Sequence, residues 1–219
     1  MCGRFALFSD PSRITRRLGL PSPETQWQPR YNIAPGTWIP AAFRQTPDDD
    51  PRLDQLWWGY RPRWAGESGP APINARAERV DSSKYFRGAF HRHRCLIPAD
   101  GWYEWKPEAG GKQPYFFARH DREPLFLGAI WEPLDDDTGC CAIITEPARG
   151  VAQEIHGRMP LVLDDASLLA WLDTELVERD AIRAAVTHLE ADALVTWPVS
   201  TRVNRPDQEG PSLLEALTP

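Results

Sequence analysis

Short runs of apolar residues, several of them alternating with polar ones, recur along this chain and predict strands. Two runs, 38–43 and 53–60, are separated by the turn sequence Asp48-Asp49-Asp50-Pro51, which predicts a β-hairpin. Further strands are predicted at 95–98, 102–105, 114–118, 125–131, 140–145 and 194–199. The chain is therefore expected to be rich in short strands.

Helical spacing of apolar residues is found in fewer places. Asp10 and Pro11 precede Ile14 and Leu18, which is typical of a capped helix with proline in its first turn. Together with the strands, this favours an α+β fold with a mainly antiparallel, barrel-like β-sheet and peripheral helices. Other helices are predicted at 148–154, 166–172 and 178–189.

The length of 219 residues suits one domain with a sizeable core. We predict a single domain over residues 1–219, with its core at about 2–204. The segment 205–219 has weak structural signals, so we expect a mobile tail there.

The composition is typical of a globular protein in water, with 42% hydrophobic and 26% charged residues. Because no apolar run reaches about 18 residues, we expect no membrane span. The first residues also lack the features of a signal peptide. The cysteines have no disulfide-like spacing, and in a cytosolic chain they would stay reduced. We expect a cytoplasmic or nucleoid-associated protein. They are Cys2, Cys95, Cys140 and Cys141.

The formal net charge of −6 argues at first against a nucleic-acid partner, but the charge is unevenly distributed. Residues 61–94 hold eight Arg and Lys against three Asp and Glu, which is 8 − 3 = +5 and leaves −11 for the remainder. One basic segment is enough for a groove that attracts phosphates. A solvated basic face is an equally good interpretation of the charge alone.

Cys2 directly follows the initiator methionine and is small enough for that methionine to be removed. Removal leaves one residue with both an α-amine and a thiol. A terminal amine has a lower pKa than lysine, so more of it is neutral and able to attack an aldehyde. The thiol can then close a five-membered thiazolidine ring. The alternative is an incidental cysteine at a variable terminus, and position alone favours it.

The segment Asn74-Ala75-Arg76-Ala77-Glu78 combines an amide with an arginine that suits a bidentate phosphate contact. A loop asparagine that caps a helix, followed by an arginine paired with Glu78, fits the same residues.

A second segment, Cys95 to Trp105, turns at Ala-Asp-Gly and returns with Glu104 between two aromatic residues. A carboxylate walled by Tyr103 and Trp105 is expected to have a raised pKa through desolvation, which suits acid/base chemistry. The alternative is an outward glutamate on an alternating strand, with Trp102 and Glu104 on one face.

His156 precedes Gly157 at the end of a predicted helix and is a candidate proton shuttle, although most single histidines are structural. His91, His93 and Cys95 alternate as on one strand face, but no second cluster has metal-ligand spacing. We therefore expect no metal and no cofactor.

Ten tryptophans are an excess for this length, and several lie in or near the basic segment. Bases of single-stranded nucleic acid stack on exposed aromatic rings while cations follow the phosphates. We expect most of the tryptophans to fill the core and Trp64, in Arg-Pro-Arg-Trp, to be exposed.

These motifs, in this order, resemble one family over nearly the whole chain. The resemblance is to the SRAP (SOS response-associated peptidase) family of abasic-site processing proteins. It rests on Met-Cys-Gly-Arg at 1–4, Tyr-Asn-Ile-Ala-Pro-Gly at 31–36, Trp-Gly at 58–59, Asn-Ala-Arg-Ala-Glu at 74–78, the segment 95–105, His-Gly-Arg-Met-Pro at 156–160 and Val-Asn at 203–204.

The resemblance implies roles for four catalytic residues. Cys2 is the nucleophile that forms a thiazolidine with the opened sugar, and Asn74 positions that sugar. Glu104 acts as acid/base and orients the α-amine, and His156 assists ring opening and reversal of the crosslink. The peptidase label implies that the chain removes its own Met1 and thereby exposes Cys2.

The resemblance also implies a DNA-binding set. Arginines hold phosphates around the lesion, Trp64 stacks on a neighbouring base, and two residues line the DNA path. These residues are Arg4, Arg76 and Arg158 for phosphate and Pro35 and Thr145 for the path. One departure is Ala65, where members that wedge bases apart have a second aromatic residue after Trp64.

The function expected from the resemblance is capture of abasic sites in single-stranded DNA by a monomer that works alongside replication-fork proteins. A second hypothesis is a cysteine hydrolase that uses Cys2 and His156 on a peptide or amide. A third is a non-catalytic single-strand binding module, for which Cys2→Ala changes nothing.

Overall fold

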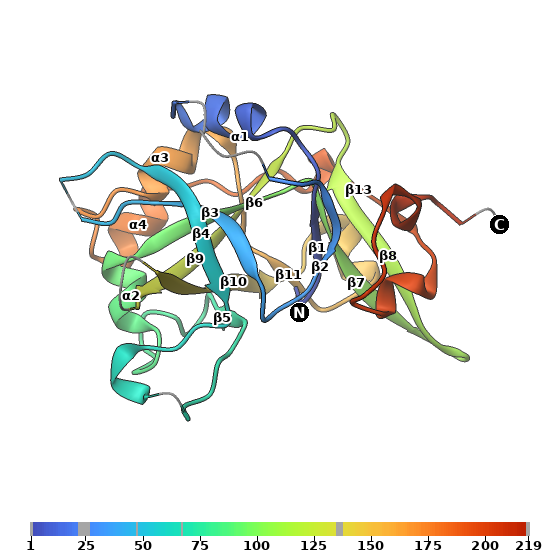
Figure 1. Ribbon diagram of the computed structural model, residues 1–219, viewed down its shortest axis with the longest axis horizontal. Coiled ribbons are helices and arrows are strands. Elements are labelled where there is room, and N and C mark those ends of the chain that lie inside the picture. The colour runs from blue at the N-terminus through green and yellow to red at the C-terminus, as the bar shows by residue number, and fades with distance from the viewer. Residues whose placement is uncertain (1, 22–26, 47, 67, 135–137, 218–219) are drawn as a thin grey trace.

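A closed ring of five strands forms the centre of the computed structural model, which describes residues 2–21, 27–46, 48–66, 68–134 and 138–217. Four neighbouring pairs are antiparallel, β4–β10 is parallel, and the β9–β10 pairing closes the ring. Figure 1 shows this barrel at the centre left of the molecule. Its strands are β3 (Trp38–Phe43), β4 (Arg52–Trp58), β6 (Arg94–Ala99), β9 (Leu125–Pro133) and β10 (Gly139–Pro147).

A second, five-stranded sheet lies beside the barrel, and all its neighbouring strands are antiparallel. In order it contains β13 (Leu194–Pro198), β8 (Gly111–Arg119), β7 (Gly101–Glu108), β1 (Phe5–Leu7) and β2 (Arg30–Ile33). Three short strands extend the barrel: β5 (Asn74–Arg76) and β11 (Arg158–Pro160) on β10, and β12 (Val162–Leu163) on β9.

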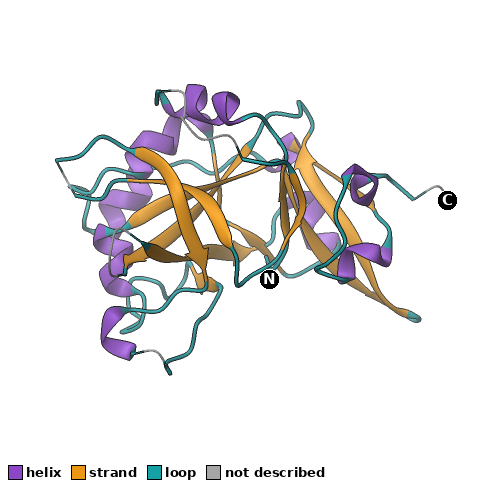
Figure 2. Ribbon diagram, viewed as in Figure 1, coloured by secondary structure: helices purple, strands orange, loops and turns teal. Residues whose placement is uncertain are grey.

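The helices lie at the periphery (Figure 2). Asp10 caps α1 by accepting the Ser12 N–H, and Gly19 ends that helix with a φ of 65°. The α-helices are α1 (Pro11–Leu18), α2 (Arg87–Arg92), α3 (Leu168–Trp171) and α4 (Arg179–Ala185). Short 3₁₀ helices are η1 (Arg63–Ala65), η2 (Gly150–Glu154), η3 (Asp165–Ser167), η4 (Ala191–Ala193), η5 (Thr201–Asn204) and η6 (Pro211–Leu214).

Two predicted helices need correction, and one helix was not predicted. The segment 148–154 forms a 3₁₀ helix at 150–154. The helix expected over 178–189 ends at Ala185, because Val186 turns to extended backbone and His188 bridges to Leu163. Helix α2 has no clear apolar stripe and was not predicted; it contains His91, so His91 and Cys95 do not share a strand face.

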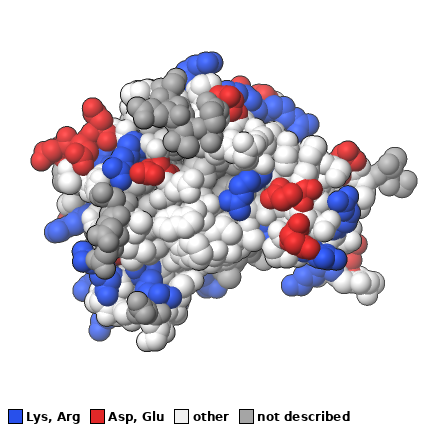
Figure 3. Space-filling model, in the orientation of Figure 1, with Lys and Arg blue, Asp and Glu red and all other residues white. Residues whose placement is uncertain are grey.

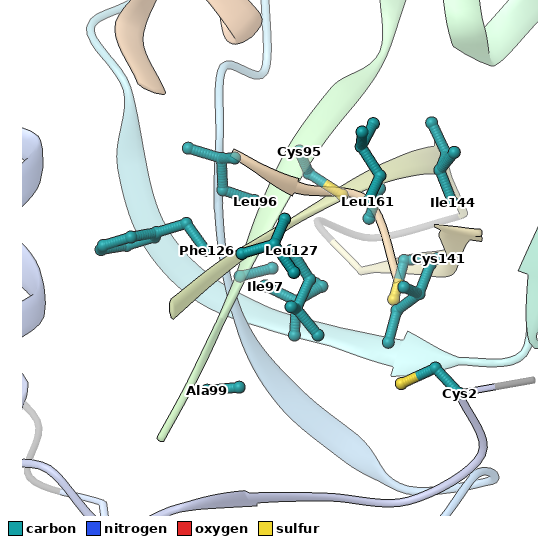
Figure 4. Close-up of a cluster of buried hydrophobic side chains, with 14 of the residues drawn as sticks. Cys2, Cys95, Leu96, Ile97, Ala99, Phe126, Leu127, Cys141, Ile144 and Leu161 are labelled. Atoms are coloured by element: carbon teal, nitrogen blue, oxygen red, sulfur yellow. The ribbon is translucent and has the colours of Figure 1, made fainter. Parts of the chain in front are cut away.

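Two clusters of buried side chains lie on opposite faces of the five-stranded sheet. The larger one fills the barrel and includes Trp102 and Phe117, whereas the smaller includes Tyr103 and Phe116 on the outer face. Successive residues of β7 therefore point alternately toward the barrel and away from it. Figure 4 shows Cys2 at the edge of the barrel cluster, close to Cys141.

The segment 205–217 packs against the outer cluster and β2. Leu213 is fully buried, the Trp197 indole N–H donates to the Leu214 carbonyl at 2.7 Å, and Glu209 accepts the Tyr31 N–H at 2.8 Å. Mobility of this tail stays a prediction, and residues 218 and 219 lie outside the described residues.

In the described part of the chain, no helix combines the length and the apolar character that crossing a membrane requires.

Candidate functional site

Cys2 lies just before β1 and is completely buried against the barrel core. Burial raises the pKa of its thiol well above the ordinary value, and the nearby Glu104 carboxylate adds to that shift. The thiol is therefore protonated near neutral pH. While Met1 is attached, the Cys2 nitrogen belongs to a peptide bond, so amine chemistry requires that Met1 be removed.

Glu104 comes from β7, the strand that pairs with β1. Phe5 lies opposite Trp102 and the Tyr103 N–H donates to the Arg4 carbonyl at 3.0 Å, so the same pairing carries Glu104 to the chain end that holds Cys2. The Glu104 residue is only 3% exposed. Burial raises the pKa of its carboxyl group, as predicted, although His156 acts in the opposite direction.

The physical reason expected for that shift needs correction. Tyr103 points to the opposite face of the sheet, into the smaller cluster, and does not wall the carboxylate. Glu104 does share a face with Trp102, as alternation requires, but this face is buried toward the barrel rather than outward. The alternative of an outward, solvated glutamate is therefore wrong.

His156 is half-buried and lies between η2 and β11. Its Nδ1 is 3.8 Å from Glu104 Oε2, and the Arg158 backbone N–H lies 3.0 Å from the same nitrogen. Both side chains line a surface pocket of about 440 Å³ together with Trp105, Lys112 and Asn204. The imidazole thus lies within ion-pair distance of the buried carboxyl group and lines the same solvent-open pocket.

Asn74 holds the Cys2 backbone. Its Nδ2 donates to the Cys2 carbonyl at 2.9 Å, while its buried Oδ1 has no hydrogen-bond partner in the described part of the chain. Asn74 begins β5, so its side chain and that of Arg76 share one face while Ala75 enters the core. The structure therefore brings Cys2, Asn74, Glu104 and His156 to one end of the barrel, from four separate parts of the sequence.

The paired strands β5, β10 and β11 lie beside this site. Thr145 pairs with Arg76 on one side and Pro160 on the other. Arg76 is exposed, Thr145 is fully buried, and Arg158 donates to the Thr145 carbonyl at 2.6 Å. Arg158 also forms a two-point ion pair with Glu78, whose pKa it lowers. The alternative interpretation of this segment had paired Glu78 with Arg76 instead.

Arg4 follows Cys2 by two residues, and its guanidinium is largely engaged inside the protein. Its Nη1 donates to Asn32 Oδ1 and to the Val203 carbonyl, both at 2.7 Å. Asn32, which sequence reasoning missed, is 2% exposed, and its Nδ2 donates to the Arg205 and Gln208 carbonyls at 2.9 Å. The network ties the chain end at Cys2 to the 203–208 turn. The motif Tyr-Asn-Ile-Ala-Pro was the available signal for Asn32.

Trp64 is 69% exposed, as predicted, and lies in η1. Its ring meets Tyr85 edge-on with centroids 5.5 Å apart. Pro35 is half-buried in the loop between β2 and β3. Of the other nine tryptophans, four are buried in the core and three are half-buried, whereas Trp38 and Trp57 are 40% and 37% exposed and were not singled out from the sequence.

Across the described ranges, no group of three or more His, Cys, Asp or Glu side chains is arranged to hold a metal ion.

We compared the sequence and the fold with those of known proteins. A family model described as SOS response associated peptidase (SRAP) matches residues 1–206. The chain belongs to this family. The resemblance identified from the motifs is thereby confirmed.

The curated relatives of this SRAP chain match it over most of its length. The abasic site processing protein YoqW of Bacillus subtilis (strain 168) is 32% identical over 225 residues, which cover 99% of this chain and 100% of that protein. The abasic site processing protein YedK of Escherichia coli (strain K12) is 33% identical over 193 residues, 86% of this chain and 85% of its own.

Solved structures share the SRAP fold. A protein from Bacteroides thetaiotaomicron superposes with a TM-score of 0.84 at 20% identity and covers 99% of this chain and 100% of its own. A phage-related protein from Bordetella bronchiseptica superposes with a TM-score of 0.72 at 31% identity. The match covers 90% of this chain and 94% of that protein. The α+β, barrel-like prediction is confirmed.

Proposed function

We propose that this SRAP protein processes abasic sites in single-stranded DNA by covalent capture on Cys2. The observation that carries the proposal is the convergence of Cys2, Glu104, His156 and Asn74 at one end of the barrel. The names of YoqW and YedK, abasic site processing proteins, support the same substrate. We further propose that the chain works as a cytoplasmic monomer near replication forks and removes its own Met1.

The chemistry proceeds in two bond-forming steps after hydrolysis of the Met1–Cys2 peptide bond. The freed α-amine attacks the aldehyde carbon of the opened sugar, and the resulting carbinolamine loses one water to give an imine. The Cys2 sulfur then bonds to the imine carbon while the thiol proton passes to the nitrogen. The product is a thiazolidine, formed from aminothiol and aldehyde with net loss of one water.

The surrounding side chains manage protons and position the nucleophile. Glu104, with its raised pKa, gives and accepts protons at the nitrogen and at the leaving oxygen, and His156 exchanges protons between Glu104 and solvent. Asn74 fixes the Cys2 carbonyl and offers its unpaired Oδ1 to a sugar hydroxyl. Reversal follows the same steps backward.

The hydrolase hypothesis fits the electrostatics less well. A cysteine hydrolase needs a thiolate, which a neighbouring cation or a helix N-terminus usually stabilises. At Cys2, burial and the Glu104 charge both raise the thiol pKa. A protonated thiol still serves the thiazolidine route, because the imine nitrogen takes up its proton.

The experiment that tests the proposal is the denatured mass of the protein after mixing with single-stranded DNA that holds one abasic site. The proposal predicts a shift by the mass of the DNA, less one water. A protein mass unchanged under denaturing conditions would defeat it. Amide turnover that survives acetylation of the α-amine would favour the hydrolase.

Arg76 is expected to contribute phosphate affinity without regard to sequence. Arg76→Ala should weaken binding to all single strands and lower the slope of log K against log salt by about 0.7, because one fewer counterion is released. Arg183→Ala, an exposed arginine of α4, is the control. Fluorescence anisotropy at several salt concentrations measures both slopes. An Arg76→Ala slope equal to that of the wild type would remove Arg76 from the interface.

Glu104→Gln is expected to separate stability from activity. Burial raises the Glu104 pKa above its unfolded value, so the wild type loses stability as pH rises through the folded pKa. Glutamine stays neutral, so the variant should melt above the wild type at pH 8, with little difference at pH 4. Crosslinking should slow by about 100-fold or more, because the acid/base group is lost.

Thermal melts at both pH values and initial crosslinking rates test this expectation. A stability gain confined to pH 4, or crosslinking at the wild-type rate, would contradict the role assigned to Glu104.

A further inference from the structure

A second hollow of about 260 Å³ lies outside the Cys2 site, against β2, β3 and β4. Buried Ile33 and Leu7 form part of its floor. Trp27, half-buried, and Trp38, 40% exposed, contribute two indole rings to its lining. In Figure 3 the centre of this face, over β3 and β4, carries few charged side chains. The hollow is large enough for one planar heterocycle.

Several polar side chains that line this hollow make no hydrogen bond to the described part of the protein. The Trp27 indole N–H is buried and has no acceptor among the described residues. Gln28 and Gln55 line the hollow and are exposed, and in the described part of the chain neither side-chain amide makes a hydrogen bond. Each amide offers two donors and an acceptor, which match the edges of nucleobases. A purely apolar ligand would leave all of these groups unused.

The positively charged side chain of Arg30 lies in the same lining as the two indole rings. Arg30 lines the hollow, and its guanidinium donates to the Trp38 carbonyl at 3.0 Å and to Thr37 Oγ1 at 3.3 Å. Both bonds go to the loop 34–37 and its junction with β3, so the charge is held in place. Stacking rings next to a fixed cation are the combination that single-stranded nucleic acid requires.

Contacts link the hollow to the loop that contains Pro35, a residue of the proposed DNA path. Trp38 meets Trp57 edge-on at 5.6 Å, and Trp57, 37% exposed, lies opposite it on β4. The loop that contains Pro35 is fixed to the same strand, because the Gly36 N–H donates to the Trp58 carbonyl at 2.9 Å. Figure 1 shows this loop joining β2 to β3 beside the barrel.

We infer that Trp27 and Trp38, with the Gln28 and Gln55 amides and Arg30, form a second base-binding subsite for an unpaired base of the strand held at Cys2. The two indoles bind the faces of the base, the amides bind its edge and the guanidinium binds its phosphate. The inference rests on the proposed function for the identity of the nucleic acid, but it makes a claim about binding that does not involve covalent capture.

The test uses the full chain with Cys2→Ala, so that only non-covalent binding is measured, and an undamaged single strand of thymidines. Trp38→Ala should weaken binding about tenfold, because one stacked base is lost, and Trp38→Phe should restore most of the affinity. Leu169→Ala, which removes an equally prominent apolar side chain on α3, should bind like its parent. Gln28→Ala with Gln55→Ala should reduce discrimination among homopolymers of different bases.

Unchanged affinity in Trp38→Ala would overturn the subsite, and so would equal loss in Trp38→Ala and Trp38→Phe. The denatured mass of the wild type with abasic DNA is read separately. A crosslink with no effect of Trp38 leaves the proposed function and removes this inference. If Trp38→Ala weakens binding but the wild type forms no crosslink, the subsite stands and the proposed covalent function is removed.

Discussion

Cys2→Ser is expected to give no adduct that survives denaturation unless a reductant traps the imine. Serine is as small as cysteine, so Met1 remains removable and the α-amine can still form an imine. The hydroxyl replaces the sulfur that closes the ring, so the stable product is lost. Intact mass first verifies that Met1 is absent, and adduct yield is then measured with and without cyanoborohydride.

Cys140→Ser is the matched control, since it removes a thiol on β10 that contacts the Arg61 backbone rather than Cys2. It should crosslink like the wild type. A Cys2→Ser adduct as stable as that of the wild type, formed without reductant, would mean that ring closure through sulfur is not the source of stability.

Gly101→Ala is expected to lower the free energy of unfolding by about 3 kcal/mol. A Cβ at this position would lie 2.2 Å from the Phe117 carbonyl oxygen and 2.3 Å from the Phe116 ring, so the backbone of the paired strand β8 would have to shift. For a chain of this size the melting temperature should fall by about 6–12 °C. Gly157→Ala has open space around the new Cβ and is the control.

Crosslinking should fall with Gly101→Ala even where the protein is folded, because Gly101 pairs with Ala6 and begins the strand that carries Glu104. Thermal melts of both variants test the prediction. Melting temperatures that agree within a few degrees would show that the close contact at Gly101 is relieved elsewhere.

The strands of the barrel were largely predictable because their signal is local. The runs at 38–43 and 125–131 are continuously apolar over the length of a strand, and the acidic turn at 48–51 follows the first of them. Strands β1 and β5 were missed because each has only three residues, too few to show a period. They form because longer strands pair with them, which is a tertiary effect.

The candidate residues were identified from their order in the family pattern, whereas their physical environment required the structure. Glu104 was expected to be desolvated by its sequence neighbours, but strand alternation turns Tyr103 away and leaves burial toward the barrel as the cause. Arg4 was expected at a phosphate and is engaged with Asn32 and Val203, 28 and 199 residues away. Contacts over such separations have no local signature.

The claim on which the account depends is that one residue provides both the nitrogen and the sulfur of the DNA adduct. Fragmentation mass spectrometry of the N-terminal peptide from the crosslinked, protease-treated protein tests it directly. The account predicts a peptide that begins at Cys2, lacks Met1 and carries the sugar with loss of one water. A sugar on a lysine, or on a peptide that retains Met1, would contradict it.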